Sequence, residues 1–202
     1  MEIVCLDLEG VLVPEIWIAF AEKTGILELK RTTRDEPDYE KLMAWRMGIL
    51  KEHGLTLSDI QDTISQIHPL PGAYEFLEKV RSITQVVILS DTFKEFAAPL
   101  MKQLGWPTIL CNSLVIDDDN MLSGMKLRQV DGKRKAIEGF RGMGFRTFAA
   151  GDSYNDLSMI HTADKGCLFR APENILKEEP DLKLCTTYDE FYGEIEKFVK
   201  ED

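Results

Sequence analysis

Apolar residues along this chain follow two alternating patterns, one typical of buried strands and the other of amphipathic helices. Nearly continuous apolar runs of four to six residues predict buried parallel strands. They cover residues 3–8, 85–89, 108–111, 147–150 and 166–169. Because helical patterns separate most of these runs, we predict a three-layer, Rossmann-like α/β fold built on a parallel sheet.

The helical segments have apolar residues every three to four positions. They cover residues 73–80, 133–142 and 154–163. A final helix over residues 188–199 carries a continuous apolar stripe, and Thr187 with Glu190 predicts a capping box at its start. Residues 115–129 are expected to form a hairpin whose turn lies at 117–120.

Residues 14–70 interrupt the alternation, because no strand pattern occurs there. Three helices are predicted instead, at 15–23, 39–52 and 58–67. Gly25 and Gly54 end the first two, and Ser58 with Gln61 is the expected capping box of the third. So long an insert predicts a small cap domain at 14–70 over the carboxyl edge of the sheet. The core would comprise residues 1–13 and 71–202.

The charge of the chain narrows its possible partners. Its 202 residues include 24 Lys and Arg against 35 Asp and Glu, which gives a net charge of −11. This balance argues against nucleic acid and anionic membrane surfaces as partners. We find no apolar run as long as the roughly 18–20 residues of a membrane span and no signal-peptide pattern. We therefore expect a cytoplasmic protein, whose oligomeric state, a homodimer included, stays open.

Cysteine and histidine give no sign of a zinc or redox site. The four cysteines are far apart in the sequence and form no C-x-x-C pair. The three histidines are equally scattered. We interpret the cysteines as free thiols, most of them in strand-like apolar runs.

Two carboxylate motifs follow predicted strands. Asp7 and Glu9 end the first one, and the next residue, Gly10, allows close backbone approach to a ligand. The second motif, G-D-S-Y-N-D at 151–156, follows the strand at 147–150 and opens a helix. Each motif alone is compatible with simple helix capping. The second, however, has more oxygen-bearing side chains than a cap requires.

Two further elements belong to the same edge of the sheet. Ser90 and Asp91 end the strand at 85–89, and Lys133 opens a helix. Strand-end carboxylates Asp7 and Asp152 are suitable Mg²⁺ ligands. Mg²⁺ and Lys133 would offset the repulsion between these carboxylates and a phosphate, because a unit charge pair about 4 Å apart is worth roughly 4 kcal/mol.

Together these motifs resemble those of the haloacid dehalogenase-like phosphatase superfamily. The resemblance rests on D-L-E-G-V at 7–11, L-S-D-T at 89–92, Lys133 and G-D-S-Y-N-D at 151–156. The helical insert after the first motif is similar to that of the phosphoserine phosphatase branch. The longer segments D-L-E-G-V-L-V-P-E-I-W, I-L-S-D-T-F and A-A-G-D-S-Y-N-D are most similar to members that also transfer phosphate to homoserine.

The resemblance implies a Mg²⁺-dependent enzyme acting on O-phospho-L-serine. Asp7 would be the nucleophile that forms an aspartyl-phosphate, and Glu9 the general acid and then base. The metal would be held by Asp7, the main-chain carbonyl of Glu9 and Asp152. Water or L-homoserine would then accept the phosphoryl group. Asp156 would either contact the metal through water or only orient Lys133.

The resemblance also implies which residues bind the substrate. Ser90 and catalytic Lys133 would bind phosphoryl oxygens, with Asp91 and Asn155 close to the substrate. In the cap, Glu15 would meet the substrate ammonium and Arg46 its carboxylate. Without the family, Glu15 is equally explained by a helix start and Arg46 by its helix propensity.

Two positions depart from the commoner family pattern, which has Asp where this chain has Glu9 and Gly where it has Asp91. Both departures match the transferase-capable members. Two alternatives stay open: a phosphatase for another small phosphate ester, and a signalling module in which phosphorylated Asp7 is long-lived. The cap and Glu9 argue against the module, because a switch needs neither an enclosed pocket nor a hydrolytic base.

Overall fold

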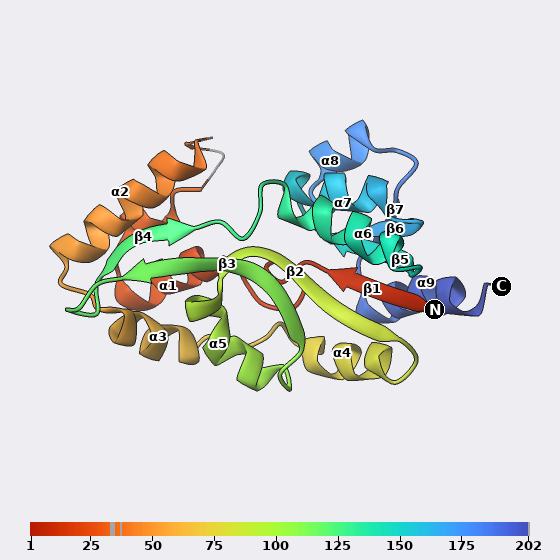
Figure 1. Ribbon diagram of the computed structural model, residues 1–202, viewed down its shortest axis with the longest axis horizontal. Coiled ribbons are helices and arrows are strands. Elements are labelled where there is room, and N and C mark those ends of the chain that lie inside the picture. Colours follow the sequence, from red (N-terminus) through yellow and green to blue (C-terminus); the bar gives the residue numbers. More distant parts are fainter. Residues whose placement is uncertain (33–34, 37, 202) are drawn as a thin grey trace.

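The computed structural model describes residues 1–32, 35–36 and 38–201; residues 33–34 and 37 of the predicted cap, and residue 202, lie outside the described residues. Its centre is a seven-stranded sheet in the order β4-β3-β2-β1-β5-β6-β7 (Figure 1). The strands are β1 (Glu2–Leu6), β2 (Gln85–Phe93), β3 (Thr108–Ile116), β4 (Leu122–Lys126), β5 (Arg146–Gly151), β6 (Lys165–Phe169) and β7 (Lys183–Cys185). All pairings are parallel except that of β3 with β4. The α/β prediction is confirmed.

Helices cover both faces of this sheet, which gives the predicted three layers. Side chains alternate along β1, so Val4 and Leu6 belong to one apolar cluster and Ile3 and Cys5 to the other. The first cluster includes α4 (Ala73–Arg81), α5 (Lys94–Gln103) and α9 (Tyr188–Lys200). The second includes α6 (Gly132–Gly142), α7 (Leu157–Thr162) and α8 (Glu173–Glu178). In Figure 1, α4 and α5 lie below the sheet and α6, α7 and α8 above it.

The segment between β1 and β2 is helical, with α1 (Ile16–Thr24), a 3-10 helix η1 (Leu27–Lys30), α2 (Tyr39–Glu52) and α3 (Leu57–Ser65). The β3–β4 hairpin reaches this segment, and α2 packs against β4 (Figure 1). At the hairpin turn, the Asn120 carbonyl accepts a 2.7 Å bond from the Leu57 amide, and Asn120 Oδ1 accepts from the Ser58 amide at 3.0 Å. The hairpin prediction is confirmed, and its tip holds the start of α3.

Two local predictions are wrong. The capping box of α3 consists of Thr56 and Asp59, not Ser58 and Gln61, because the helix begins at Leu57. The helix predicted at 154–163 is divided into a 3-10 turn η2 (Tyr154–Asp156) and α7. The Asp156 carboxylate accepts hydrogen bonds from the amides of Asp152 and Ser153, and this contact closes the first turn as a 3-10 turn. The capping box at Thr187 and Glu190 is confirmed.

The strand register aligns the polar loops at one edge of the sheet. Leu6 of β1 pairs with Ile88 of β2 on one side and with Ala150 of β5 on the other. The residues that follow these positions therefore emerge side by side at the carboxyl edge.

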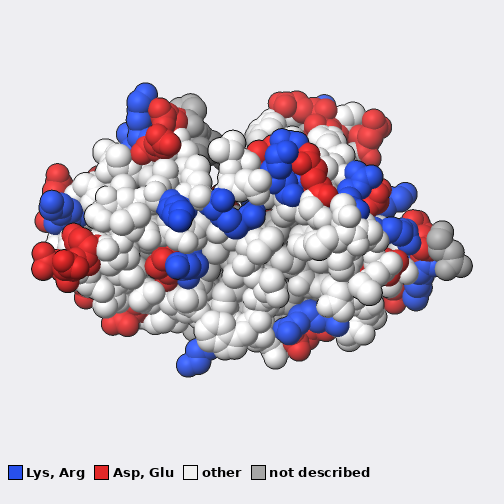
Figure 2. Space-filling model, in the orientation of Figure 1, with Lys and Arg blue, Asp and Glu red and all other residues white. Residues whose placement is uncertain are grey.

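Charged side chains of both signs are interspersed on the face seen in Figure 2, with broad uncharged areas between them. Within the described ranges, no helix combines the length and apolar character needed to cross a membrane.

Candidate active site

Lys133 is the centre of the charged network at the carboxyl edge of the sheet. It lies in the first turn of α6 and is buried. Its Nζ lies 2.9 Å from Asp7 Oδ1, 2.6 Å from Asp156 Oδ1 and 3.6 Å from Asp91 Oδ2. Asp7 directly follows β1, Asp91 lies near the end of β2, and Asp156 ends the 3-10 turn η2 that follows β5, so one lysine connects segments at the carboxyl ends of three strands.

Asp156 is the most constrained of these acids. Its side chain is fully buried, and its Oδ2 accepts bonds from the Asp152 and Ser153 amides, each at 3.1 Å. A Cβ on Gly151 would lie 2.1 Å from Asp156 Cγ, so only glycine leaves room for this carboxylate. One oxygen of Asp156 therefore fixes the 152–153 backbone while the other fixes Lys133.

The carboxylates of Asp7, Asp152 and Asp156 fit a divalent cation. One oxygen from each lies within 4.8 Å of the others. Gly10 has a φ of +75°, and a Cβ there would lie 2.2 Å from Asp152 Oδ2, so the glycine makes the space that Asp152 occupies. Oxygen ligands of this kind suit Mg²⁺. Both oxygens of Asp156 already accept hydrogen bonds, one from Lys133 and the other from the Asp152 amide.

The electrostatics of the cluster favour an added cation. Burial, followed by the charge of Asp156, raises the pKa of Asp7 well above its usual range, although Lys133 opposes the shift. Burial and Asp156 likewise raise the pKa of Asp152 to about 7. Burial alone would lower the pKa of Lys133, but the charges of Asp156, Asp7 and Asp91 outweigh it and raise that pKa. The lysine stays charged, yet the carboxylates outnumber it.

Glu9 lies beside this network. Its Oε2 accepts a 2.8 Å bond from the Ile16 amide at the start of α1. Burial, followed by the nearby charge of Glu15, raises the pKa of Glu9 to about 7. A carboxyl group that titrates near neutral pH can both donate and accept a proton.

Arg46 is a buried cation on the inner side of α2. Its guanidinium carbon lies 4.4 Å from the centre of the Trp17 ring, and Nη2 donates to the Arg31 carbonyl at 2.6 Å. Its Nε has no hydrogen-bond partner among the described residues. Burial lowers the pKa of Arg46 to about 10, so the group is still charged at neutral pH. A buried N–H without a partner is unusual in a folded protein, so this nitrogen is available to a further acceptor such as a water molecule or a ligand.

Glu15 precedes α1 but makes no side-chain capping bond there. Its side chain is exposed, and its charge contributes to the raised pKa values of Glu9 and Asp152. Glu15 therefore lies near the charged cluster and is not used as a helix cap.

The remaining predicted residues surround Asp91. Asn155 Nδ2 donates to Asp91 Oδ2 at 2.9 Å, and Ser90 is buried directly before Asp91. Two contacts were missed from the sequence: the Asp91 carbonyl accepts bonds from Asn112 Nδ2 at 2.9 Å and from the Tyr39 hydroxyl at 3.4 Å. The signal for Asn112 was its polar side chain in the middle of an apolar strand.

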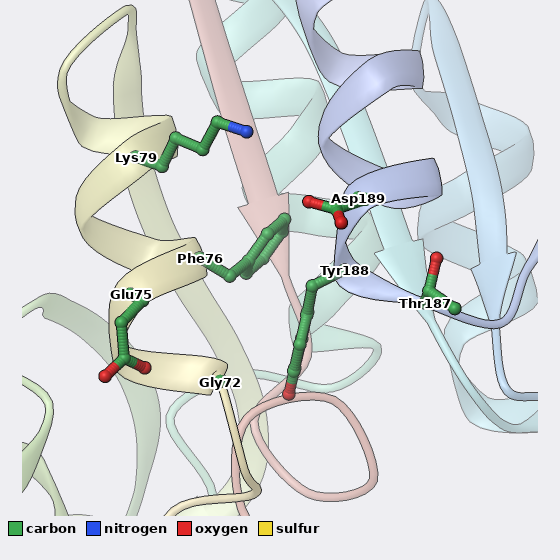
Figure 3. Close-up of a pocket in the computed structure, with 7 residues that line it drawn as sticks. All are labelled: Gly72, Glu75, Phe76, Lys79, Thr187, Tyr188 and Asp189. Carbon is green, nitrogen blue, oxygen red and sulfur yellow. The ribbon is translucent and has the colours of Figure 1, made fainter.

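A concavity of about 270 Å³ lies away from this cluster, between α4 and α9 (Figure 3). It is lined by Gly72, Glu75, Phe76, Lys79, Thr187, Tyr188 and Asp189. In Figure 3 the Tyr188 hydroxyl points toward the loop after β1, where it donates a 2.6 Å bond to the Val11 carbonyl. Tyr188 thus supports the loop that carries Glu9, but the lining includes none of the predicted site residues.

Residues 6–161 match the family model for haloacid dehalogenase-like hydrolases. The chain belongs to this family. Among curated relatives, phosphoserine phosphatase ThrH of Pseudomonas aeruginosa is 57% identical over 98% of this chain and 96% of its own length. A phosphoserine phosphatase of Pseudomonas syringae pv. tomato is 55% identical over 99% of this chain and 83% of that protein.

Solved structures agree on the haloacid dehalogenase-like fold. A phosphoserine phosphatase from T. onnurineus superimposes with a TM-score of 0.73 at 25% identity, covering 96% of this chain and 94% of that one. A substrate-bound phosphoserine phosphatase complex gives a TM-score of 0.78 at 23% identity, with 98% of each chain covered. At that identity the second match shows the fold alone.

Proposed function

We propose that this protein is a Mg²⁺-dependent phosphoserine phosphatase and phosphotransferase that works through a phosphorylated Asp7. The observation that carries the proposal is the network in which Lys133 joins Asp7 and Asp156, together with a buried Arg46 whose Nε has no partner among the described residues. The two Pseudomonas relatives, each named a phosphoserine phosphatase, support the choice of substrate.

Substrate binding would divide between the two sides of the pocket. Arg46 would offer its charge and the Nε that has no partner among the described residues to the substrate carboxylate, and Glu15, which makes no capping bond, would offer its carboxylate to the ammonium. Lys133 and Ser90 would hold phosphoryl oxygens at the sheet edge, with Asp91 and Asn155 beside them. In this proposal, residues 14–70 form the cap domain that closes over residues 1–13 and 71–202.

The first chemical step transfers the phosphoryl group to the enzyme. An Asp7 carboxylate oxygen attacks phosphorus, and the bond between phosphorus and the serine oxygen breaks. Glu9 in its acid form donates a proton to that departing oxygen, so L-serine leaves neutral at its hydroxyl. Mg²⁺, bound by Asp7, the Glu9 carbonyl and Asp152, would neutralise charge on the phosphoryl group.

The second step regenerates Asp7. Glu9, now a carboxylate, takes a proton from water or from the hydroxyl of L-homoserine, whose oxygen attacks phosphorus. The bond between phosphorus and Asp7 breaks, which releases phosphate or phosphohomoserine. A Glu9 pKa of about 7 suits both directions of proton transfer at neutral pH. Such a metabolic role agrees with a cytoplasmic location, which we also propose.

The test is turnover of O-phospho-L-serine with Mg²⁺, with and without L-homoserine. Free phosphate and phosphohomoserine are measured separately, and the Asp7→Asn protein is the control for contaminating phosphatases. We expect phosphate release in both reactions and phosphohomoserine only when homoserine is present. Phosphate without phosphohomoserine would limit the enzyme to hydrolysis, and no phosphate at all would contradict the proposed substrate.

A further inference from the structure

The end of β2 carries a bulge in its pairing with β3. Leu89 pairs with Leu110 of β3, but the next paired residue of β2 is Phe93, which is opposite Asn112. Three residues of β2, 90–92, therefore stand opposite a single residue of β3. The bulge lifts Ser90 and Asp91 out of the strand ladder, and both belong to the proposed phosphate site. Its shape must be held by other contacts, because the ladder bonds are lost there.

Ser90 Oγ accepts from the Thr92 amide within the bulge, the Tyr39 hydroxyl donates to the Asp91 carbonyl at 3.4 Å, and Asn112 makes the shorter contact to that carbonyl. Asn112 is buried, with a relative exposure of 7%. Nδ2 donates to the Asp91 carbonyl at 2.9 Å, and Oδ1 accepts from the Arg128 amide at 3.0 Å. One side-chain amide thus links the bulge of β2 to the chain that leaves β4.

The segment that follows β4 leads directly to Lys133. Arg128 Nη2 donates to the carbonyl of Gly132 at 2.8 Å, and Gly132 is the residue before Lys133. Lys133 Nζ in turn lies 3.6 Å from Asp91 Oδ2. A closed path therefore runs from the Asp91 carbonyl through Asn112, Arg128 and Lys133 back to the Asp91 carboxylate.

We propose that Asn112 is a positioning residue that sets the spacing between the Ser90–Asp91 bulge and Lys133. It touches no substrate; it acts through the two peptides that its amide group holds. This inference rests on the proposed function, because it assigns the phosphoryl group to the space between the bulge and Lys133. The alternative is that Asn112 only stabilises the hairpin, in which case its loss would lower stability without a specific effect on turnover.

The decisive variant is Asn112→Asp, which keeps the size of the side chain and the acceptor for Arg128. It replaces the donor with a second oxygen that faces the Asp91 carbonyl, so the bulge must shift. We expect kcat for phosphoserine to fall on the order of 10²-fold, since small misplacements of reacting groups have effects of that size. KM should change less than about threefold, because Arg46 and Glu15 are untouched. Partial unfolding would also lower the apparent kcat at constant KM, so the fall must persist in protein that circular dichroism shows to be folded at the assay temperature.

Asn120→Ala is the matched control in the same hairpin. It removes the side-chain contacts to Ser58 at the start of α3, which lie far along the hairpin from the bulge. It should lower the Tm but leave kcat within about twofold of wild type. If the Asp variant fails to fold, Asn112→Ser provides a neutral, shorter side chain that still breaks the bridge, and the same fall in kcat is expected.

Binding of orthovanadate, which mimics the five-coordinate phosphorus of the transition state, separates this inference from the proposed function. Calorimetry with Mg²⁺ requires no turnover, and Asn112→Asp should bind orthovanadate at least tenfold more weakly than both wild type and Asn120→Ala. If wild type turns over no phosphoserine, the proposed function fails and the orthovanadate result alone decides the role of Asn112. Affinity and kcat within twofold of the Asn120→Ala protein would overturn the inference.

Discussion

The carboxyl edge of the sheet and the helices above it differ in how their charges are satisfied. At the sheet edge, Lys133 contacts Asp7 and Asp156 within 3 Å, and backbone amides hold the other oxygen of Asp156. In α2, by contrast, Arg46 donates to a neutral carbonyl and leaves its Nε without a partner in the described part of the chain. The side chains of the first region are already held by one another and by the backbone, whereas Arg46 in the second region keeps a donor available to a ligand.

This difference indicates a division of labour. Reacting groups must be held rigidly, and strand ends tied by a buried lysine do this well. Groups that select a substrate gain most when a ligand fills their unmet bonding capacity. Changes at the sheet edge should therefore lower kcat, whereas changes at Arg46 should raise KM.

Replacement of Asp7 by Asn gives the largest expected effect. The amide keeps the shape of the side chain but cannot form the covalent intermediate, so kcat should fall on the order of 10⁴-fold or more. Steady-state phosphate release measures it, and circular dichroism checks that the variant is folded. Turnover within tenfold of wild type would remove Asp7 from the mechanism.

Glu9→Gln should lower kcat by roughly 10²–10⁴-fold, the usual contribution of general acid–base catalysis. Because the pKa of Glu9 is about 7, wild-type transfer of the phosphoryl group to Asp7 should slow as pH rises through 7 and the acid form disappears. Rapid-quench measurement of serine release from pH 5.5 to 8.5 tests this slope. The Gln variant should lose the slope, and an unchanged profile would assign the proton transfer to another group.

Arg46→Ala should raise KM for phosphoserine on the order of 10²-fold with a much smaller change in kcat. Phosphoethanolamine has the same ammonium and phosphate but no carboxylate, so its kcat/KM should be nearly unaffected. Arg46→Lys is the matched control, because it keeps the charge and loses the planar fork. Equal losses for both substrates would mean that Arg46 supports the fold of α2 and does not recognise the carboxylate.

The smallest effect concerns stability. Folding raises the pKa values of Glu9 and Asp152 to about 7, so between roughly pH 4 and 7 the metal-free folded state binds more protons than the unfolded state. Its free energy of unfolding should therefore fall as pH rises through this window. Mg²⁺ at about 100 times its Kd should restore about 2.7 kcal/mol near pH 8 and much less near pH 5. Urea titrations at the two pH values, with Mg²⁺ or EDTA, measure this, and equal Mg²⁺ stabilisation at both would contradict a metal bound by these carboxylates.

The residues at the sheet edge could be predicted from the sequence more completely than those of the helical segment. Asp7 and Asp152 follow apolar runs that are recognisable as buried strands, and the register of parallel strands then brings them together. Local pattern gave no reason to choose Glu15 or Arg46 over other charged helix residues; only the family resemblance selected them. Asn112 was missed because its proposed role depends on the bulge in β2 and on Arg128, which lies 16 residues later in the sequence and contacts Asn112 only in the folded protein. Such contacts arise from tertiary geometry that no local spacing encodes.

In the proposed mechanism the phosphoryl group passes through Asp7. This step is tested most directly by mixing the enzyme with O-phospho-L-serine and Mg²⁺, quenching in acid within milliseconds and mapping the phosphate by peptide mass spectrometry after borohydride reduction of the acyl phosphate. We predict reduced, formerly phosphorylated Asp7 in wild type, more of it in Glu9→Gln if the second step is slowed further than the first, and none in Asp7→Asn. Full turnover with no label at Asp7 at any quench time, or label on another residue, would contradict the account.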